Sequence, residues 1–597
     1  MNVHPVDITI IIVYFTAMIL IGFWFTRRAS KNLDSYFLGG KSLPWYMLGI
    51  SNAASMFDVS GTMWLVYLLF VYGLKSAFIP WLWPTFNQVF LMVYLAVWLR
   101  RSNVLTGAEW IRTRFGKGLG AELSYVSVVI FALVSVVSFI GYAYQGVGKF
   151  AVVFFPWEAS PHVYAMVILG ITAIYTMLGG MYSVVISDVV QFIIMCIVSV
   201  CIGAIAISRT TPETIAAAVP ADWSNLWFGW KLNLDWTGIL DSVNKSIEGD
   251  GYSLFGFFMM MVLFKGILAS MAGPAPNYDL QRVLSTKDTK SAALMSATVS
   301  FVLYIPRYLL IAGITVLAIV FFRPRLVEMG EKVDFEQILP YVIGNFIPVG
   351  LMGLLLAGLL AAFMSTFSST INSGAAYLVN DIYKGYVNKN ASNRTLFMMS
   401  CFCSLLVVAA GITFGLLTKS IHQIVNWIVA GLYGGYIAPN VLKWHWWRFN
   451  GFGYFAGMMA GILAALIMPH VAKDLPAIYG FPFLLVLSLA ASIIGSLVMS
   501  PEDDNTLKKF YMQVRPWGFW KPVQEKVIAE NPGFMPNKNF GRDMVNVGVG
   551  IVWQLTFTIV PIYLVIRKFK AMSIAIVILV LTSIFLKFNW YDKLEEN

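Results

Sequence analysis

Four hydroxyl side chains cluster inside a long apolar stretch, GLLLAGLLAAFMSTFSSTINSGAAYLVNDIYK, that begins at Gly353. The cluster consists of Ser365, Thr366, Ser368 and Ser369. This spacing places the hydroxyls on one face of a helix, where oxygen is costly in hydrocarbon unless it meets a polar partner, water or an ion. Hard cations such as sodium bind such oxygens, so the cluster predicts an ion site. The alternative is that the hydroxyls only hold packed transmembrane helices together.

The composition indicates that the element carrying this cluster crosses a membrane. The 597 residues are 58% hydrophobic and 12% charged, with a mean hydropathy of +0.73. Apolar runs of about 20 residues recur along the chain, so we expect an all-α polytopic membrane protein with about 15 transmembrane helices. The expected spans are 7–26, 44–72, 78–99, 122–150, 161–181, 182–208, 251–272, 292–321, 348–382, 396–418, 421–443, 453–473, 477–500, 544–566 and 571–590.

The basic residues predict the orientation of these helices. Arg282 and Lys287 follow the seventh span, and with other basic loops they mark the cytoplasmic side, which places the N-terminus outside. The acidic segment 209–250 then lies outside, while Arg567 and Lys568 break the rule. The net charge of +11 follows this loop pattern and does not indicate nucleic acid binding. With no targeting extension, the pattern fits a bacterial inner membrane.

Two expected helices are interrupted in the middle. The second span contains SNAASMFDVSG from Ser51, and the seventh ends in GILASMAGPAPNYD, which includes Gly273 and Pro274. Interrupted helices free backbone carbonyls, which at membrane depth must line a cavity or an ion site. Paired interruptions in two halves of a chain indicate an inverted-repeat secondary transporter. A simple proline kink is the alternative for the seventh span taken alone.

The sequence carries no P-loop, zinc signature or nucleophile elbow, so we expect neither an enzyme nor an organic cofactor. The four cysteines lack metal-site spacing. A passive channel and a transporter-like sensor are the remaining alternatives to a transporter. The expected partners are the lipid bilayer, sodium and a small-molecule solute, with no obligate protein partner evident.

Three motifs together make the chain similar to the solute:sodium symporter family, the relatives of sodium/sugar and sodium/proline cotransporters. They are AAFMSTFSSTINSGAAYLVNDIYK from Ala361, MYSVVISDVVQ around Asp188, and NYDLQRVLSTKD from Asn277. The resemblance implies a leucine-transporter-type five-plus-five inverted-repeat core. This transport core would span 44–443, after an extra N-terminal helix and loop in 1–43 and before extra C-terminal helices in 444–597 that include a cytoplasmic linker, 501–543.

The resemblance also implies a sodium site between the first and eighth core helices. Its ligands would be the carbonyls of Met56, Val59 and Ala362 and the hydroxyls of Ser365 and Thr366.

Some family members have a second sodium site, which would use Asp188, Ser365, Ser368 and Ser369 here. Independently of the family, an ionisable residue such as Asp188 inside an apolar span is a functional candidate. The alternative is that Asp188 lies near a helix end and binds neighbouring backbone.

The candidate solute-binding residues lie beside the first broken helix and on three other spans. They are Asp58, Ser60, Trp81, Lys265, Gln423 and Asn426. The rings of Trp81 and Trp83 could stack on a sugar, or anchor the protein in the interface. We expect Lys265 to pair with Asp58, which would leave a neutral pocket suited to a sugar.

An unpaired Lys265 or Arg307 would instead favour a carboxylate-bearing solute. The sequence therefore predicts a sodium-coupled symporter that imports a sugar or sugar derivative by alternating access, with an amino acid or a uronate-type anion as the alternative solute.

Overall fold

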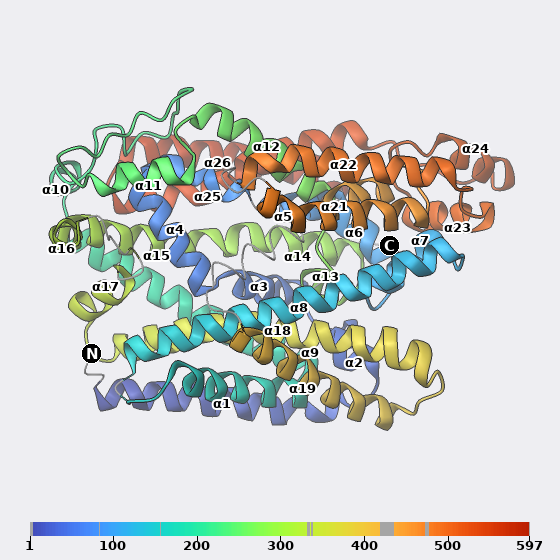
Figure 1. Cartoon of the computed structure of the whole chain (residues 1–597), viewed down its shortest axis with the longest axis horizontal. Helices are drawn as coiled ribbons and strands as arrows, with labels where there is room; N and C mark the ends of the chain where they lie inside the picture. Colours follow the sequence, from blue (N-terminus) through green and yellow to red (C-terminus); the bar gives the residue numbers. More distant parts are fainter. Residues whose placement is uncertain are drawn as a thin grey trace.

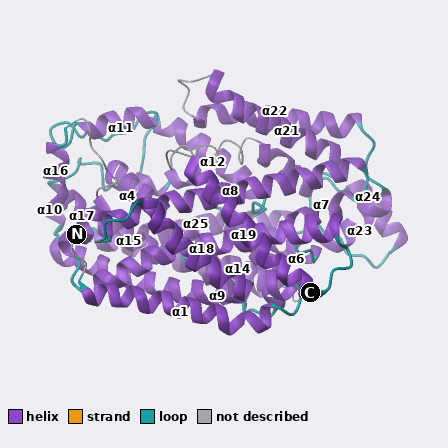
Figure 2. Ribbon diagram, turned by 60° about the horizontal axis from the view of Figure 1, so that its bottom comes forward, coloured by secondary structure: helices purple, strands orange, loops and turns teal. Residues whose placement is uncertain are grey.

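The computed structural model describes residues 4–82, 84–155, 157–276, 278–330, 335, 338–417, 435–471 and 477–595. Named secondary-structure elements in these ranges are helices, and the long ones run side by side along the long axis of the molecule (Figures 1 and 2). Within these ranges, ten helices are long and apolar enough to cross a membrane, or up to thirteen if each bent pair is one span. The expected all-α membrane architecture is therefore confirmed.

The helices of the first half of the chain are α1 (Pro5–Ala29), α2 (Leu33–Leu38), η1 (Gly39–Lys41), α3 (Trp45–Met56), α4 (Val59–Tyr72), η2 (Gly73–Ala77), η3 (Ile79–Leu82), α5 (Asn87–Phe90), η4 (Leu91–Leu95), α6 (Ala96–Ser102), α7 (Gly107–Phe115), α8 (Leu119–Phe154), α9 (Pro161–Arg209), α10 (Pro212–Ala216), α11 (Ser242–Asp250), α12 (Phe255–Met271) and α13 (Tyr278–Leu284). Those that follow are α14 (Thr289–Val302), α15 (Tyr304–Leu317), η5 (Ala318–Phe322), α16 (Arg323–Glu328), α17 (Ile338–Phe346), α18 (Leu351–Ala376), η7 (Tyr377–Val387), α19 (Asn393–Leu417), α21 (Gly451–Val471), α22 (Ala477–Val498), α23 (Asp504–Val514), α24 (Lys521–Glu530), α25 (Phe540–Val565), α26 (Phe569–Asn589) and η8 (Tyr591–Lys593). A further helical segment covers 435–445.

Both predicted helix interruptions are present. Helix α3 ends at Met56, and Asp58 caps the N-terminus of α4 by accepting a hydrogen bond from the backbone N–H of Gly61 at 2.7 Å. Helix α12 ends at Met271, where Gly273 adopts a φ of +87° that favours glycine, and α13 resumes the helical path. Each interruption leaves helix ends inside the bundle, where their free backbone groups need polar partners.

The predicted boundary between spans 161–181 and 182–208 lies at a break in the structure. Both spans belong to the element α9, but Gly180, with a φ of +51° and a ψ of −144°, is not helical and divides α9 into two helices. A Cβ atom at Gly180 would lie 2.5 Å from the carbonyl oxygen of Tyr36, so this close approach requires glycine. Most of the predicted span 421–443 lies outside the described residues.

The segment 209–250 lies at the same end of the molecule as the N-terminus, with α16 and α17 (Figure 1). Two buried tryptophans from this segment bind the last turn of α4. The indole N–H of Trp223 donates to the carbonyl of Phe70 at 2.8 Å, and that of Trp236 donates to the carbonyl of Val71 at 3.1 Å. These bonds satisfy carbonyl groups that a helix end leaves free.

The last two helices form a complete hairpin, and its basic turn is bound by the end of α9 and by the segment 209–250. The ammonium group of Lys568 donates to Ser224 Oγ at 2.6 Å, and Arg567 donates to the carbonyl of Ile207. The two cations therefore lie on the side where the rule of basic loops does not expect them, because carbonyl and hydroxyl groups at this end accept their hydrogen bonds.

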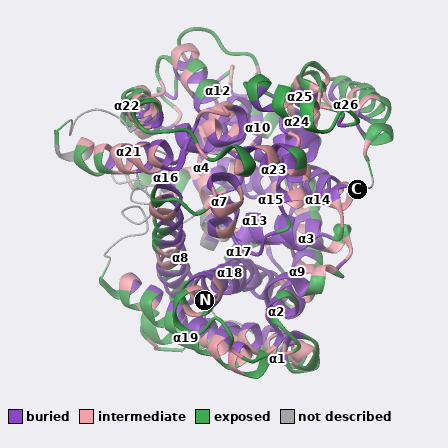
Figure 3. Cartoon of the chain, turned by 90° about the vertical axis from the view of Figure 1, so that its right-hand side faces the viewer, coloured by how far each residue is buried: buried purple, intermediate pink, exposed green. Residues whose placement is uncertain are grey.

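Helix α18 lies near the centre of the bundle, whereas the C-terminal helix lies at its edge (Figure 3). In its most apolar window, the span Leu351–Val387 has 83% of residues buried, against 11% for the span Phe569–Lys593. The hydroxyl cluster is therefore carried by a helix that other helices surround, and its oxygens face protein.

Candidate ion and solute site

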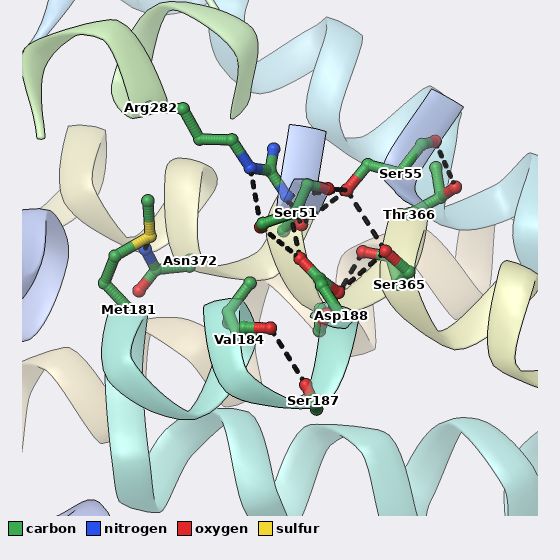
Figure 4. Close-up of polar contacts among 12 residues, drawn as sticks. Ser51, Ser55, Met181, Val184, Ser187, Asp188, Arg282, Ser365, Thr366 and Asn372 are labelled. Atoms are coloured by element: carbon green, nitrogen blue, oxygen red, sulfur yellow. Dashed lines mark hydrogen bonds and ion pairs between the residues drawn. The ribbon is translucent and has the colours of Figure 1, made fainter. Parts of the chain in front are cut away.

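The hydroxyl cluster of α18 packs against the end of α3, just before the break in that helix. The hydroxyl of Thr366 donates to the carbonyl of Ser55 at 2.8 Å and lies 3.3 Å from the carbonyl of Ala362 (Figure 4). Ser55 Oγ lies 3.2 Å from Ser365 Oγ and 3.1 Å from Ser369 Oγ. Hydroxyl and carbonyl oxygens from two helices thus gather in one buried place, as the sequence predicts.

Asp188 on α9 connects the same two helices. One of its carboxylate oxygens accepts a hydrogen bond from Ser365 Oγ at 2.7 Å, and the other accepts from Ser51 Oγ at 2.5 Å (Figure 4). The side chain is fully buried. Asp188 is therefore held by side chains from α3 and α18, which differs from the alternative in which it binds only neighbouring backbone.

Arg282 supplies the positive charge of this network. Its guanidinium group lies 3.0 Å from the Asp188 carboxylate and donates to Ser55 Oγ and Ser369 Oγ, both at 2.6 Å. A further hydrogen bond, of 2.9 Å, joins its Nε to Ser51 Oγ. Through these contacts the second broken helix, which carries Arg282 on α13, reaches the first.

Our expectation that Arg282 marks a cytoplasmic loop is wrong, because its side chain is only 1% exposed. The chain re-enters the bundle after the Gly273 break, so α13 continues inside the protein and carries Arg282 with it. The signal that could have placed it is the break itself. The residues that follow an interrupted helix belong to its second half, and a buried arginine there needs a carboxylate such as Asp188.

The remaining predicted ion ligands have different surroundings. Ser368 Oγ donates to the carbonyl of Ser365 at 3.1 Å, within its own helix, so it differs from Ser369, which contacts Arg282. Met56 is the last residue of α3 and is half-buried. The side chains of Val59 and Ser60 lie outside the described part of the structure.

Asp58 forms a second charged group at the break between α3 and α4. Its carboxylate lies 3.3 Å from the guanidinium group of Arg307 on α15 and accepts a hydrogen bond from Tyr142 on α8 at 2.9 Å. The Asp58 side chain is 21% exposed and that of Arg307 13%, so the pair is only partly covered. The site thus joins a carboxylate, a guanidinium and a phenol at the point where the first broken helix changes direction.

The predicted ion pair between Asp58 and Lys265 is wrong. The start of α15 lies beside the start of α4, so Arg307 reaches the carboxylate of Asp58. Lys265 on α12 is buried, and its ammonium group lies 5.6 Å from the ring centre of Phe481. The sequence shows that Lys265 and Arg307 both lie inside apolar spans, where a charge is costly. Which of them contacts Asp58 depends on tertiary packing.

Trp81 is buried, which excludes a lipid-facing anchor for this residue. Its ring packs edge-to-face against Phe86 at a centroid distance of 4.6 Å, and its carbonyl lies against Gly266 of α12.

The other predicted solute-binding residues, Gln423 and Asn426, lie outside the described residues, as does Trp83. Ser51, Ser55, Tyr142 and Arg282 are site residues that sequence reasoning did not select.

Comparisons with known proteins agree with this arrangement. The sequence model of the sodium:solute symporter family matches residues 36–461. The chain is 23% identical over 593 residues to the sodium/glucose cotransporter 4 of Danio rerio, which covers 90% of this chain and 84% of that protein. It is 23% identical over 529 residues to the sodium/glucose cotransporter of Vibrio parahaemolyticus (84% of this chain, 92% of that protein). It is 23% identical over 588 residues to the human sodium/myo-inositol cotransporter (88% and 76%).

A solved structure of a Na⁺-coupled sialic acid symporter, in a substrate-bound outward-open state, is similar to most of this chain. The TM-score is 0.65 at 19% sequence identity, and the match covers 84% of this chain and 99% of that one. This likeness shows that the two chains share a fold, which is the leucine-transporter type expected from the sequence.

Proposed function

The chain belongs to the sodium:solute symporter family, and we propose that it imports a sugar or sugar-like solute together with sodium by alternating access. The observation that carries the proposal is the contact between Thr366 of α18 and the carbonyl of Ser55 at the break in the first broken helix. It places the hydroxyl-rich helix and an interrupted helix end side by side. Oxygen atoms from both elements lie within reach of one cation.

We propose that sodium binds between α18 and the broken helix α3–α4. The ligands would be the carbonyls of Met56, Val59 and Ala362 and the hydroxyls of Ser365 and Thr366. Two observations support this set: the distances from Thr366 Oγ1 to the carbonyls of Ser55 and Ala362, and the end of α3 at Met56. The carbonyls at a helix C-terminus carry partial negative charge, which favours a cation there.

Such a site couples sodium to solute through the shape of the broken helix. A cation that holds α4 against α18 also fixes Asp58 at the start of α4, on the other side of the break. If the solute contacts Asp58, each ligand raises the affinity for the other, and this linkage is reciprocal. The bound state then closes on one side and opens on the other, which releases both ligands.

The solute site is proposed beside Asp58 and Arg307. Their pairing makes this part of the site net neutral, and the partly exposed carboxylate and guanidinium groups can accept from and donate to the hydroxyls of a polyol. The named relatives are glucose and myo-inositol cotransporters, which supports a sugar-like solute. An acidic sugar such as a uronate is the alternative solute.

A second sodium ion at Asp188, Ser368 and Ser369 is a separate proposal, and it requires the Arg282 side chain to move. The carboxylate of Asp188 already has a cationic partner at 3.0 Å, so a sodium ion could bind there only after the Arg282 side chain moves away. The test is the Hill coefficient for sodium. If wild-type uptake shows two-ion cooperativity that Asp188→Ala leaves unchanged, the second ion does not bind at Asp188.

The chain is an integral membrane protein, and we propose a bacterial inner membrane with the N-terminus outside. The family consists of transporters, so we propose that the chain has no enzymatic activity and needs no organic cofactor or obligate protein partner. Residues 44–443 would form the transport core, and the linker 501–543 would lie on the cytoplasmic side. Its helices α23 and α24 are at the end of the molecule opposite the N-terminus (Figure 1).

The experiment that tests the function is solute uptake into proteoliposomes, with and without an inward sodium gradient. The panel contains neutral sugars, myo-inositol, a sugar acid, proline and a short carboxylate. We expect accumulation of a neutral sugar or polyol that requires sodium. Accumulation without any sodium stimulation would overturn the proposal, and sodium-driven uptake of proline alone would replace the solute class.

A further inference from the structure

A polar cavity lies beside the break between α12 and α13, and its lining includes no residue of the proposed sodium site. Its walls come from α6, α7, α8, the break itself, α13, the helical segment 435–445 and α21. The polar and aromatic residues among those that line it are Trp110, Tyr436, Asn440, Lys443, Trp444 and Tyr454.

Lys443 is the charged residue of this cavity. It is 9% exposed, and its ammonium group donates to Asn440 Oδ1 at 2.6 Å. The same group lies 4.6 Å from the ring centre of Trp110 and 5.4 Å from that of Trp444. Throughout the described residues, Lys443 has no carboxylate within 4.0 Å. An amide oxygen and two indole faces attract the cation but do not neutralise it.

The indole N–H of Trp110 is a second, independent observation that indicates a ligand in this cavity. The Trp110 side chain is 2% exposed and its indole N–H has no hydrogen-bond partner among the described residues. A buried donor without an acceptor is costly, and such donors are rare in folded proteins. The cavity is therefore lined by a cation that lacks a counter-charge and by a donor that lacks an acceptor.

The neighbouring buried cation, Arg114, differs from Lys443 because backbone carbonyls surround its charge. Arg114 of α7 is fully buried, but its guanidinium group donates to the carbonyls of Lys443, Trp446 and Phe449 at 2.9 to 3.1 Å. The carbonyl of Lys443 lies in the last turn of the segment 435–445 and those of Trp446 and Phe449 follow it, so the three stabilise a cation at a helix C-terminus, where partial negative charge collects. Lys443 receives no such set of carbonyls.

From these contacts we infer that the cavity binds a small monovalent anion, chloride or a short carboxylate, held by Lys443 and Trp110. One acceptor atom or group would neutralise the ammonium and satisfy the indole N–H. The two indoles beside Lys443 favour a small or flat anion over a bulky polyhydroxylated one. This site shares no residue with the proposed sodium and solute sites. Its wall includes Pro274 and Pro276, so a bound anion would stabilise the break that precedes α13.

The test is thermal unfolding of the purified full-length protein in detergent, at fixed sodium concentration and fixed ionic strength. Sodium gluconate is replaced stepwise by sodium chloride, bromide, formate or acetate. We expect the unfolding temperature to rise with chloride, bromide or formate and to reach a plateau, as binding to one site requires. Separate curves for halides and carboxylates show which anion the site prefers. Constant sodium keeps this result independent of the proposed transport function.

Two variants decide whether the rise comes from this cavity. Lys443→Gln is expected to abolish the plateau response, whereas the control Lys508→Gln, at an exposed pair with Glu530, keeps it. Trp110→Phe retains a ring but loses the N–H, and we expect its half-saturating anion concentration to be about tenfold higher, in line with the loss of one buried hydrogen bond. If Lys443→Gln fails to fold, Trp110→Phe still gives the answer. A wild-type response that is identical for all anions, or that both cavity variants retain, would overturn the inference.

Discussion

Asp188 and Arg282 lie 94 positions apart in the chain and form an ion pair of 3.0 Å whose side chains are 0% and 1% exposed. The pair joins α9 to α13, and the serines around it belong to α3 and α18. Side chains from four helices therefore meet at one charged contact. Since a buried charge is stable only with its partner, the pair stabilises one specific arrangement of these helices.

Loss of one partner of this pair should destabilise the protein strongly. Arg282→Gln or Asp188→Asn alone leaves a buried charge without its partner, which costs about 3–5 kcal/mol. The double variant has no buried charge and should recover part of that loss. Thermal unfolding of the four proteins, in a double-mutant cycle, measures the coupling. Additive effects of the two substitutions would show that the pair is not a stabilising unit.

Thr366 should control the affinity for sodium. Thr366→Ala removes a proposed ligand, and we expect the sodium concentration for half-maximal uptake to rise about tenfold, equivalent to about 1.4 kcal/mol. Thr366→Ser keeps the hydroxyl and should remain close to the wild type. The matched control is Thr370→Ala, one turn further along α18, whose hydroxyl binds the carbonyl of Thr366 in its own helix. Equal sodium dependence in Thr366→Ala and Thr370→Ala would exclude Thr366 as a ligand.

Asp58 should affect solute binding more than sodium binding. Asp58→Asn can still cap α4, because asparagine is a good N-cap residue, but it loses the ion pair with Arg307. We expect the KM for solute to rise about tenfold, with a smaller change in sodium affinity. Asp58→Ala also loses the cap, at a further cost of about 0.5–2 kcal/mol in stability. An unchanged KM for solute in Asp58→Asn would place the solute elsewhere.

The segment 209–250 should be stabilised by an ion pair that depends on pH. Burial raises the pKa of Asp222, but hydrogen bonds from Lys75 at 2.8 Å and from Asn225 outweigh it and hold this pKa below its ordinary value. A carboxyl group with a depressed pKa stabilises the fold above its unfolded pKa, and this contribution is lost as pH falls through the folded value.

The difference in unfolding temperature between wild type and Asp222→Asn is therefore expected to be at its maximum near pH 7. It should decrease below about pH 4, near the ordinary pKa of an aspartate. In a Lys75→Gln background the same comparison should show a much smaller difference at pH 7. A difference that stays constant down to pH 3 would contradict the assignment of this stability to the ionised carboxylate.

The sequence predicts the elements of the site better than their contacts. Gly273, Pro274 and the small residues after Ser51 predict where two helices break, because helix interruption is a local property of the chain. The hydroxyl face of α18 follows from helical periodicity alone. Such features depend on neighbours along the chain, so they can be read without a structure.

The ion pairs depend on tertiary packing and could not be read in this way. Asp58 has two cations within the membrane spans as possible partners, Lys265 and Arg307, and only the position of α15 beside α4 selects Arg307. Arg282 follows a break, and its sequence position is equally compatible with a loop. A rule that treats basic residues after a span as loop residues fails where the chain turns back into the bundle.

Because Trp223 and Trp236 attach the segment 209–250 to the last turn of α4, the position of α4 can be followed from an exposed site on this segment. Two indole hydrogen bonds to consecutive carbonyls fasten this part of the segment 209–250 to α4. Trp227, in the same segment, is 82% exposed. A fluorophore or spin label placed at position 227 is therefore expected to report a displacement of the last turn of α4 from an exposed site.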